Sequence, residues 1–358
     1  MTKNILAIAI AAAVMAPSAF AAATVYGVAH MSGNSFSSVN DGTGTSAGLN
    51  SMSSNSSRLG IKGSEDIGGG TSLVYQMEFG VSMDGNADNG ANAATGINST
   101  RNTFVGLGGG FGTVLAGRHD SLIKMSGRKY DLFGDQIGNN RNILGGANAV
   151  ASYVVDGRHN NVLAYISPTW SGFHFGVAYV PSSAVTQVET YDNVVNKNAA
   201  VTAIADYTAG NFSVTAGYID VDKLGGNAIT AYRLGAGYTF GAAKVVGLYQ
   251  NAKIATTSSQ DAYGLGGSYK VGTAGTIKAQ YYTVQEANSA KNDATLTTVG
   301  YDHAITKNTT AYAVYSAAHN GSGASYTTDM TSSGSGSNVT AIMGKDNSAL
   351  SVGIIHNF

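Results

Sequence analysis

The side chains best suited to chemistry in this sequence are charged groups gathered in one long segment, residues 119–157. They are Lys124, Arg128, Lys129 and Arg141, against Asp120, Asp131, Asp135 and Asp156. A compact domain rarely holds so long an irregular segment unless the segment is functional or disordered. Residues 130–133 at its centre include three large apolar side chains, which a loop that meets only solvent does not need. We therefore expect residues 119–157 to fold against the interior of the protein.

Opposite charges held apart across a narrow water-filled gap create an electric field that orients polar solutes. Asp131 and Asp135 are candidates for the acidic side, although Asp131 also fits a turn residue bonded to its own backbone. Arg58 and Arg158 are candidates for the basic side, because alternation with apolar neighbours puts each on the polar face of its segment. The simpler alternative is that these arginines only solvate that face.

Enzyme and metal motifs occur only as chance matches. Residues 44–48 fit the Gly-x-Ser-x-Gly pattern, but the segment is rich in Ser and Gly and lacks the required strand–turn–helix context. Residues 84–88 resemble the start of a calcium loop, yet Asn89 and Thr95 replace the glycine and glutamate it needs. The chain has no cysteine, and its seven histidines lack metal-ligand spacing. We predict no enzyme activity, metal site or cofactor.

The first 21 residues have the pattern of a cleaved signal peptide: Lys3, an apolar run, and a small-x-small ending at Ala21. Residues 22–358 then form one domain. Only 11% of the residues are charged and the formal net charge is −1, whereas globular proteins average about 25% charged residues. A nucleic-acid partner would need a basic surface, so none is expected.

The elements that must position these charges are β-strands, because polar and apolar residues alternate in segments such as 58–64 and 232–240. A soluble sandwich shows the same alternation. A membrane barrel is favoured by strands of about ten residues, joined alternately by short and long connections. Aromatic residues also fall at the strand ends. The short turns are expected near residues 68–70, 109–110, 168–172, 209–211, 241, 272–275 and 306–308.

Seven short turns join fourteen strands, and a first and a last strand make sixteen. The fold class is therefore expected to be all-β: a transmembrane antiparallel β-barrel of sixteen strands, wide enough for an aqueous channel. The long connections, including residues 33–55, are expected to be external loops. The third of them, residues 119–157, is expected to fold into the lumen.

Several stretches together resemble the general bacterial porins of β-proteobacteria, a family of sixteen-stranded trimeric outer-membrane channels. They are residues 57–70 (SRLGIKGSEDIGGG), 104–107 (FVGL), 111–114 (FGTV), 117–118 (GR), 130–133 (YDLF) and 352–358 (VGIIHNF). The resemblance implies a basic wall facing an inward third loop. It implies that terminal Phe358 is the signal read by the barrel-assembly machinery. It also implies a homotrimer embedded in outer-membrane lipid and lipopolysaccharide.

Carried over residue by residue, the resemblance gives a candidate set for the constriction. The basic wall would hold Arg58, Arg101, Arg118 and Arg158, with Lys62 on the same strand as Arg58; the loop would supply Asp120, Arg128, Asp131, Asp135 and Arg141. Since the loop's own formal charge is zero, the wall arginines predict a weak preference for anions. The expected function is passive diffusion of small hydrophilic solutes and ions. The alternatives are a substrate-specific outer-membrane channel and a surface adhesin or structural barrel.

Overall fold

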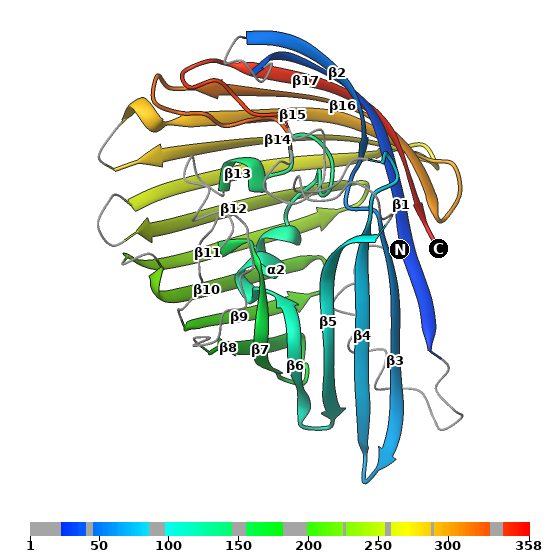
Figure 1. Ribbon diagram of the computed structural model, residues 1–358. Coiled ribbons are helices and arrows are strands. Elements are labelled where there is room, and N and C mark those ends of the chain that lie inside the picture. The colour runs from blue at the N-terminus through cyan, green and yellow to red at the C-terminus, as the bar shows by residue number, and fades with distance from the viewer. Residues whose placement is uncertain are drawn as a thin grey trace.

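Antiparallel strands form one closed barrel in the computed structural model of this protein (Figure 1). The structure describes residues 23–40, 46–85, 97–144, 155–181, 199–224, 227–254, 259–287, 290–329 and 339–358. The predicted signal peptide, residues 1–21, lies outside these described residues. In the part of the chain that is described, no helix is both long and apolar enough to cross a membrane.

The strands follow one another around the barrel in chain order. They are β1 (Thr24–Asn40), β2 (Ser46–Ser54), β3 (Arg58–Gly68), β4 (Thr71–Val81), β5 (Ile97–Gly109), β6 (Gly112–Asp120), β7 (Arg158–Ile166), β8 (Phe173–Val180), β9 (Ala200–Ala209), β10 (Phe212–Leu224), β11 (Asn227–Phe240), β12 (Ala243–Ile254), β13 (Ser259–Val271), β14 (Gly275–Glu286), β15 (Ala294–Ala304), β16 (Thr309–Asn320) and β17 (Asn347–Asn357). The barrel closes where β17 pairs with β1, from Val28 opposite Asn357 to Ser37 opposite Ser348.

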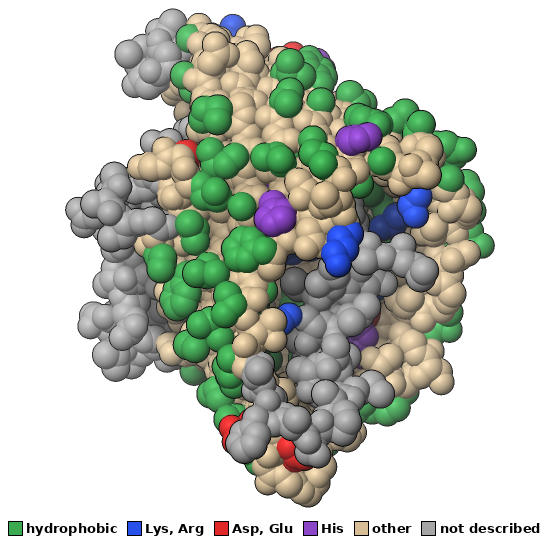
Figure 2. Space-filling view, turned by 90° about the vertical axis from the view of Figure 1, so that its right-hand side faces the viewer, with side chains coloured by type: hydrophobic (Ala, Val, Ile, Leu, Met, Phe, Trp, Pro, Cys, Tyr) green, Lys and Arg blue, Asp and Glu red, His purple; other side chains and the backbone are tan. Residues whose placement is uncertain are grey.

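The predicted alternation sends apolar side chains outward and polar ones inward. In β11, Tyr232 and Leu234 are exposed, whereas Arg233 between them is fully buried. Exposed aromatic residues gather near the short turns, as expected; they include Trp170, Phe173, Tyr238, Phe240 and Tyr269. Figure 2 shows apolar side chains scattered over the outer surface and a hollow with Lys and Arg side chains at its edge. Apolar surface facing outward is what a strand in lipid requires.

All seven predicted short turns are confirmed, but the first long connection is not an external loop. β1 extends to Asn40 and pairs with β2, from Met31 opposite Ser54 to Phe36 opposite Leu49. β2 and β3 are one crossing interrupted at residues 55–57, so the described residues contain a sixteen-strand barrel with one extra strand. The expectation for residues 33–55 was wrong because their many Ser, Gly and Asn residues are weak strand formers. Backbone pairing on both sides of β1 outweighs that low propensity.

The interruption between β2 and β3 keeps its backbone groups satisfied. Ser57 Oγ accepts from His30 N at 3.0 Å and donates to His30 O at 3.0 Å. Asn55 N also donates to His30 O, at 2.9 Å. A side chain therefore replaces the missing partner in the ladder, and a buried bulge without such bonds would be costly.

The core lies inside the barrel, between the strands and the segment that follows β6. This segment contains α2 (Leu122–Arg128) and α3 (Arg141–Leu144), and α2 lies within the curve of the sheet (Figure 1). Each of the four buried apolar clusters combines wall residues with residues of this segment; those of the segment and its return are Leu122, Ile123, Tyr130, Phe133, Ile137, Ile143, Leu144 and Val155. His119 and Asp120 belong to β6, so the loop begins two residues later than predicted.

Candidate functional site

The loop after β6 packs closely against the inner wall because wall glycines leave room for its aromatic residues. A Cβ at Gly235 in β11 would lie 2.4 Å from Tyr130 Cδ2, and a Cβ at Gly300 in β15 would lie 2.8 Å from Phe133 Cε1. Tyr130 and Phe133 are both almost fully buried. The apolar centre of the segment is therefore buried inside the barrel, on the face opposite the exposed apolar side chains.

A chain of ion pairs joins the loop to the wall. Arg58 Nη1 in β3 lies 3.3 Å from Asp135 Oδ2 in the loop. Arg128, at the end of α2, lies 3.6 Å from that same oxygen and 3.6 Å from Asp120 Oδ2. Arg158 Nη2 in β7 completes the chain at 3.0 Å from Asp120 Oδ1. Five predicted residues thus form one continuous cluster.

Two further side chains support the Asp120 end of this cluster. Lys124 Nζ donates to Asp120 Oδ1 at 2.8 Å, one helical turn away. Asn102 Oδ1 in β5 accepts from Arg158 Nε at 2.8 Å and from Asp120 N at 3.0 Å. Charge-assisted bonds of this kind are stronger than neutral ones, so Asp120 and Arg158 are held firmly.

The two predicted loop carboxylates have different surroundings. Burial acts to raise the pKa of Asp135, but the charges of Arg128 and Arg58 outweigh it and hold that pKa below its ordinary value. Burial raises the pKa of Asp131, which makes no ion pair with any of the residues that the structure describes. Its Oδ1 instead accepts from Phe133 N at 3.1 Å and from Gln280 Nε2 at 3.2 Å. Asp131 thus makes the turn bond considered from the sequence as well as a bond to the wall.

The remaining basic candidates lie outside this chain of ion pairs. Arg101 in β5 is 9% exposed, and its Nε lies 2.6 Å from Glu78 Oε1 in β4. Glu78 also accepts from the Tyr26 hydroxyl at 2.9 Å. Lys62 Nζ lies 5.0 Å from the centre of the Tyr26 ring, a cation–π contact. These four residues form a second polar group on the wall of β1, β3, β4 and β5.

Arg118 and Arg141 are each placed by other contacts. Arg118 Nε donates to Thr100 O at 2.9 Å, and its Nη1 donates to Asn160 Oδ1. Arg141 begins α3, where its backbone N donates to Asn139 Oδ1 at 2.9 Å. Its Nε is buried and has no hydrogen-bond partner among the described residues. These contacts are separate from the Arg58–Asp135–Arg128–Asp120–Arg158 cluster.

The cluster differs from the predicted arrangement in one respect: the charges are in contact. The expected gap between loop acids and wall arginines is spanned at Asp135 and Arg58, 3.3 Å apart. The two polar groups together contain six basic side chains, Arg58, Lys62, Arg101, Lys124, Arg128 and Arg158, against three acidic ones, Glu78, Asp120 and Asp135. The local charge is therefore positive although the whole chain has a formal charge of −1.

Sequence reasoning missed the basic residues that bind the loop to the opposite wall. Arg233 in β11 bonds Asp156 through both terminal nitrogens, at 2.8 Å each. Lys278 in β14 donates to Gln136 Oε1 at 2.8 Å and pairs with Asp302 at 3.0 Å. Alternation puts Arg233 on the inner face, between Tyr232 and Leu234, but alternation carries no information about its partner across the barrel.

Comparisons with known proteins agree with this architecture. Residues 7–349 match the family described as Gram-negative porin. The outer membrane porin protein 32 of Delftia acidovorans is 31% identical over 328 residues, which cover 87% of this chain and 88% of that protein. A solved structure, the anion-selective porin from Comamonas acidovorans, matches with a TM-score of 0.76 and 25% identity, covering 94% of this chain and 100% of that one. The chain therefore belongs to the Gram-negative porin family.

Proposed function

We propose that this outer-membrane porin passes small hydrophilic solutes and ions by passive diffusion through a channel narrowed by residues 121–157, with a weak preference for anions. The observation that carries the proposal is the positive excess in the cluster around Arg58, Arg128 and Arg158. Charges nearest the narrowest point dominate selectivity, because those beyond a Debye length of about 8 Å are screened at physiological salt. The anion-selective relative from Comamonas acidovorans supports the same reading.

The distribution of apolar contacts supports a path along one side of the lumen. The four clusters that seat the loop draw core residues from the strands β6 to β17 and from β1, and among the described residues β3 and β4 contribute none. Arg58, Lys62 and Glu78 lie on those two strands. We place the solute path along this polar wall, where water has no apolar packing to displace.

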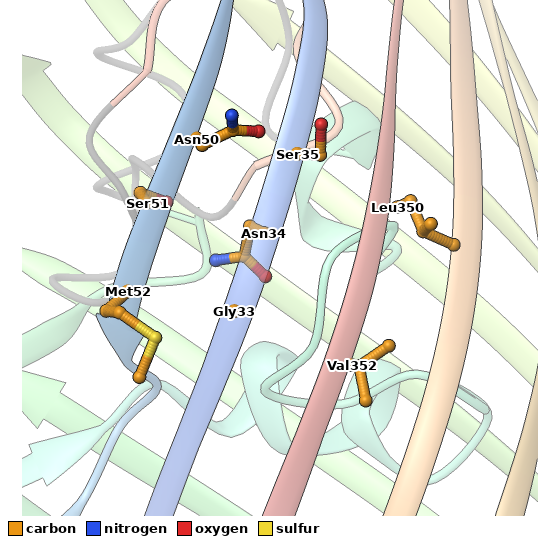
Figure 3. A pocket seen from close by; sticks show the side chains of 8 residues that line it. All are labelled: Gly33, Asn34, Ser35, Asn50, Ser51, Met52, Leu350 and Val352. Atoms are coloured by element: carbon orange, nitrogen blue, oxygen red, sulfur yellow. The ribbon is translucent and has the colours of Figure 1, made fainter.

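The partners follow from the same proposal. We propose a homotrimer in outer-membrane lipid and lipopolysaccharide, inserted by the barrel-assembly machinery through Phe358. A groove on β1, β2 and β17, lined in part by Gly33, Ser35, Met52 and Val352, supports a subunit contact there (Figure 3). Met52, Leu350 and Val352 present exposed apolar side chains there, beside the small residues Gly33 and Ser35. No enzyme activity is proposed, and the relatives are channels.

Deletion of residues 125–145 tests the narrowing. The backbone ladder closes without these residues, so the barrel should fold and its single-channel conductance in a planar bilayer should rise. Circular dichroism of the purified protein checks that the strands are retained. A folded deletion variant with unchanged conductance would show that the loop does not limit the channel.

A further inference from the structure

Arg233 is the largest fully buried side chain of the described residues, and all five of its N–H groups have acceptors. Nη1 donates to Asp156 Oδ1 at 2.8 Å and to Ile123 O at 2.9 Å. Nη2 donates to Asp156 Oδ2 at 2.8 Å and to Gln250 Oε1. Nε also donates to Gln250 Oε1, at 2.9 Å. An arginine with this many fixed bonds cannot change its position without breaking several together.

Arg233 and its neighbour Gln250 together bond three separate parts of the loop. Arg233 bonds Ile123 in α2, near the start of the loop, and Asp156, where the loop returns to β7. Gln250 on neighbouring β12 adds the third part, because its Nε2 donates to Leu144 O, the last residue of α3, at 2.6 Å. One pair of wall side chains therefore holds the beginning, the middle and the end of the loop.

Gly127 provides the space that this arrangement requires. A Cβ added at Gly127 would lie 2.4 Å from Arg233 Nη1 and 3.1 Å from its Cζ. Arginine ends usually give way to a new methyl group, but this one is held by Asp156 and Gln250. The absence of a side chain at Gly127 lets α2 lie directly on the guanidinium.

The contacts on the opposite side of the loop are looser. In the Arg58–Asp135 pair the side chains are 17% and 19% exposed, and the atoms are 3.3 Å apart. In the Arg233–Asp156 pair they are 0% and 2% exposed, and the atoms are 2.8 Å apart. Partly exposed pairs are weakened by water and salt, so they cannot by themselves fix a long loop. The buried Arg233–Asp156 pair is therefore better suited than the Arg58–Asp135 pair to fix the loop's position.

We propose that Arg233 is a positioning residue for the constriction. With Gln250 and Asp156 it holds the loop against the β11–β12 wall and away from β3 and β4, which keeps the channel steadily open. This inference rests on the proposed narrowing by residues 121–157. Without the clamp, the loop would remain in the barrel but would drift across the solute path and close it for short intervals.

The test separates loop position from barrel stability. Arg233→Met alone leaves Asp156 buried and unpaired, which is destabilising, whereas Arg233→Met with Asp156→Leu removes both charges together. Because Gln250 Oε1 and Ile123 O still lose a donor, we expect the double variant to melt below the wild type but clearly above Arg233→Met alone. In planar bilayers it should nevertheless show spontaneous and voltage-induced closures at least about tenfold more often, equivalent to about 1.4 kcal/mol.

Two further variants complete the design. Gly127→Ala displaces the guanidinium without changing any charge, so it should raise the closure frequency in the same way. Lys129→Gln is the matched control, because Lys129 also joins the loop to the wall, 3.3 Å from Asp206, but with 32% of its side chain exposed. Its closure frequency should equal that of the wild type.

A double variant that closes no more often than the wild type would overturn the proposal and leave Arg233 with a structural role only. The proposal would also be overturned if Lys129→Gln and the double variant closed equally often. The loop deletion, recorded in the same series, keeps this failure distinct from failure of the proposed function. If the loop deletion raised the conductance while the Arg233 variants closed no more often than the wild type, the clamp would be rejected and the constriction retained.

Discussion

At the scale of single residues, two carboxylates four positions apart in the same loop have opposite electrostatic environments. Asp135 is paired with Arg58 and Arg128, which hold its pKa below the ordinary value of 3.8 in spite of burial. Asp131 is partly buried beside Gln280, and this burial raises its pKa above that value. Asp131 therefore takes up a proton first as the pH falls, while the ion pairs of Asp135 persist.

This difference predicts how selectivity depends on pH. As the pH falls toward 3.8, protonation of Asp131 removes a negative charge and the anion preference should increase. Because its folded pKa is raised, protonation of Asp131 also favours the folded loop as the pH falls through that pKa. Zero-current potentials in a salt gradient at successive pH values measure the change. Asp131→Asn keeps the acceptor oxygen and should abolish the dependence; a variant that retains it in full would assign the titration elsewhere.

Neutralising Asp135 should act at every pH. Asp135→Asn removes the partner of both Arg58 and Arg128, so the positive excess at the constriction grows by one charge. We expect a clear increase in anion preference at neutral pH that persists as the pH falls, measured as zero-current potentials in a salt gradient. A variant with the same preference as the wild type at neutral pH would contradict the role proposed for Asp135.

The sequence predicts which side of a strand a charged residue faces, but it does not predict which residue that side chain pairs with. Period-two alternation correctly puts Arg58 and Arg233 on the inner face, because side-chain direction along a strand depends only on parity. The pairs Arg58–Asp135 and Arg233–Asp156 join positions far apart in the chain. Which carboxylate meets which arginine depends on how the loop folds inside the barrel, and no local pattern encodes that.

At the scale of elements, turns were easier to predict than the ends of strands. Glycine-rich turns such as residues 68–70 have positive φ at each residue, which only glycine adopts at little cost. The hairpin of β1 and β2 was missed because Ser, Gly and Asn between residues 33 and 54 have low strand propensity. Pairing with β17 holds that region in the sheet, and this pairing links the two ends of the described barrel.

The closing strand pair makes Phe358 a sharp test of assembly. Gly27 N donates to Phe358 O at 2.9 Å, and Phe358 N donates to Gly27 O at 3.1 Å, so the last residue completes the contact with β1. The residue is 55% exposed, which is compatible with the proposed recognition by the assembly machinery. Deleting Phe358 should greatly reduce the heat-sensitive trimer band on a denaturing gel of outer membranes. Normal levels of that band in the truncated chain would reject the signal, and a wild-type protein that runs alike with and without heating would reject the trimer.

At the scale of the whole molecule, net charge and local charge point in different directions. The chain carries a formal charge of −1, whereas the two polar groups around Arg58 and Arg101 have more basic than acidic side chains. Salt screens the distant charges, so the local excess decides which ion passes more easily. The ion pairs within the cluster reduce its field, so we expect the preference for anions to be weak and cations still to pass.

The zero-current potential of single channels in a potassium chloride gradient tests this account most directly. The wild-type channel should give a zero-current potential of the sign expected when chloride is more permeable than potassium. This potential should be smaller at high salt than at low salt. Replacing Arg58 and Arg158 together by Ser should move the potential toward cation preference, because two wall charges next to Asp135 and Asp120 are lost. A wild-type channel that already prefers cations, or a double variant with an unchanged potential, would contradict the account.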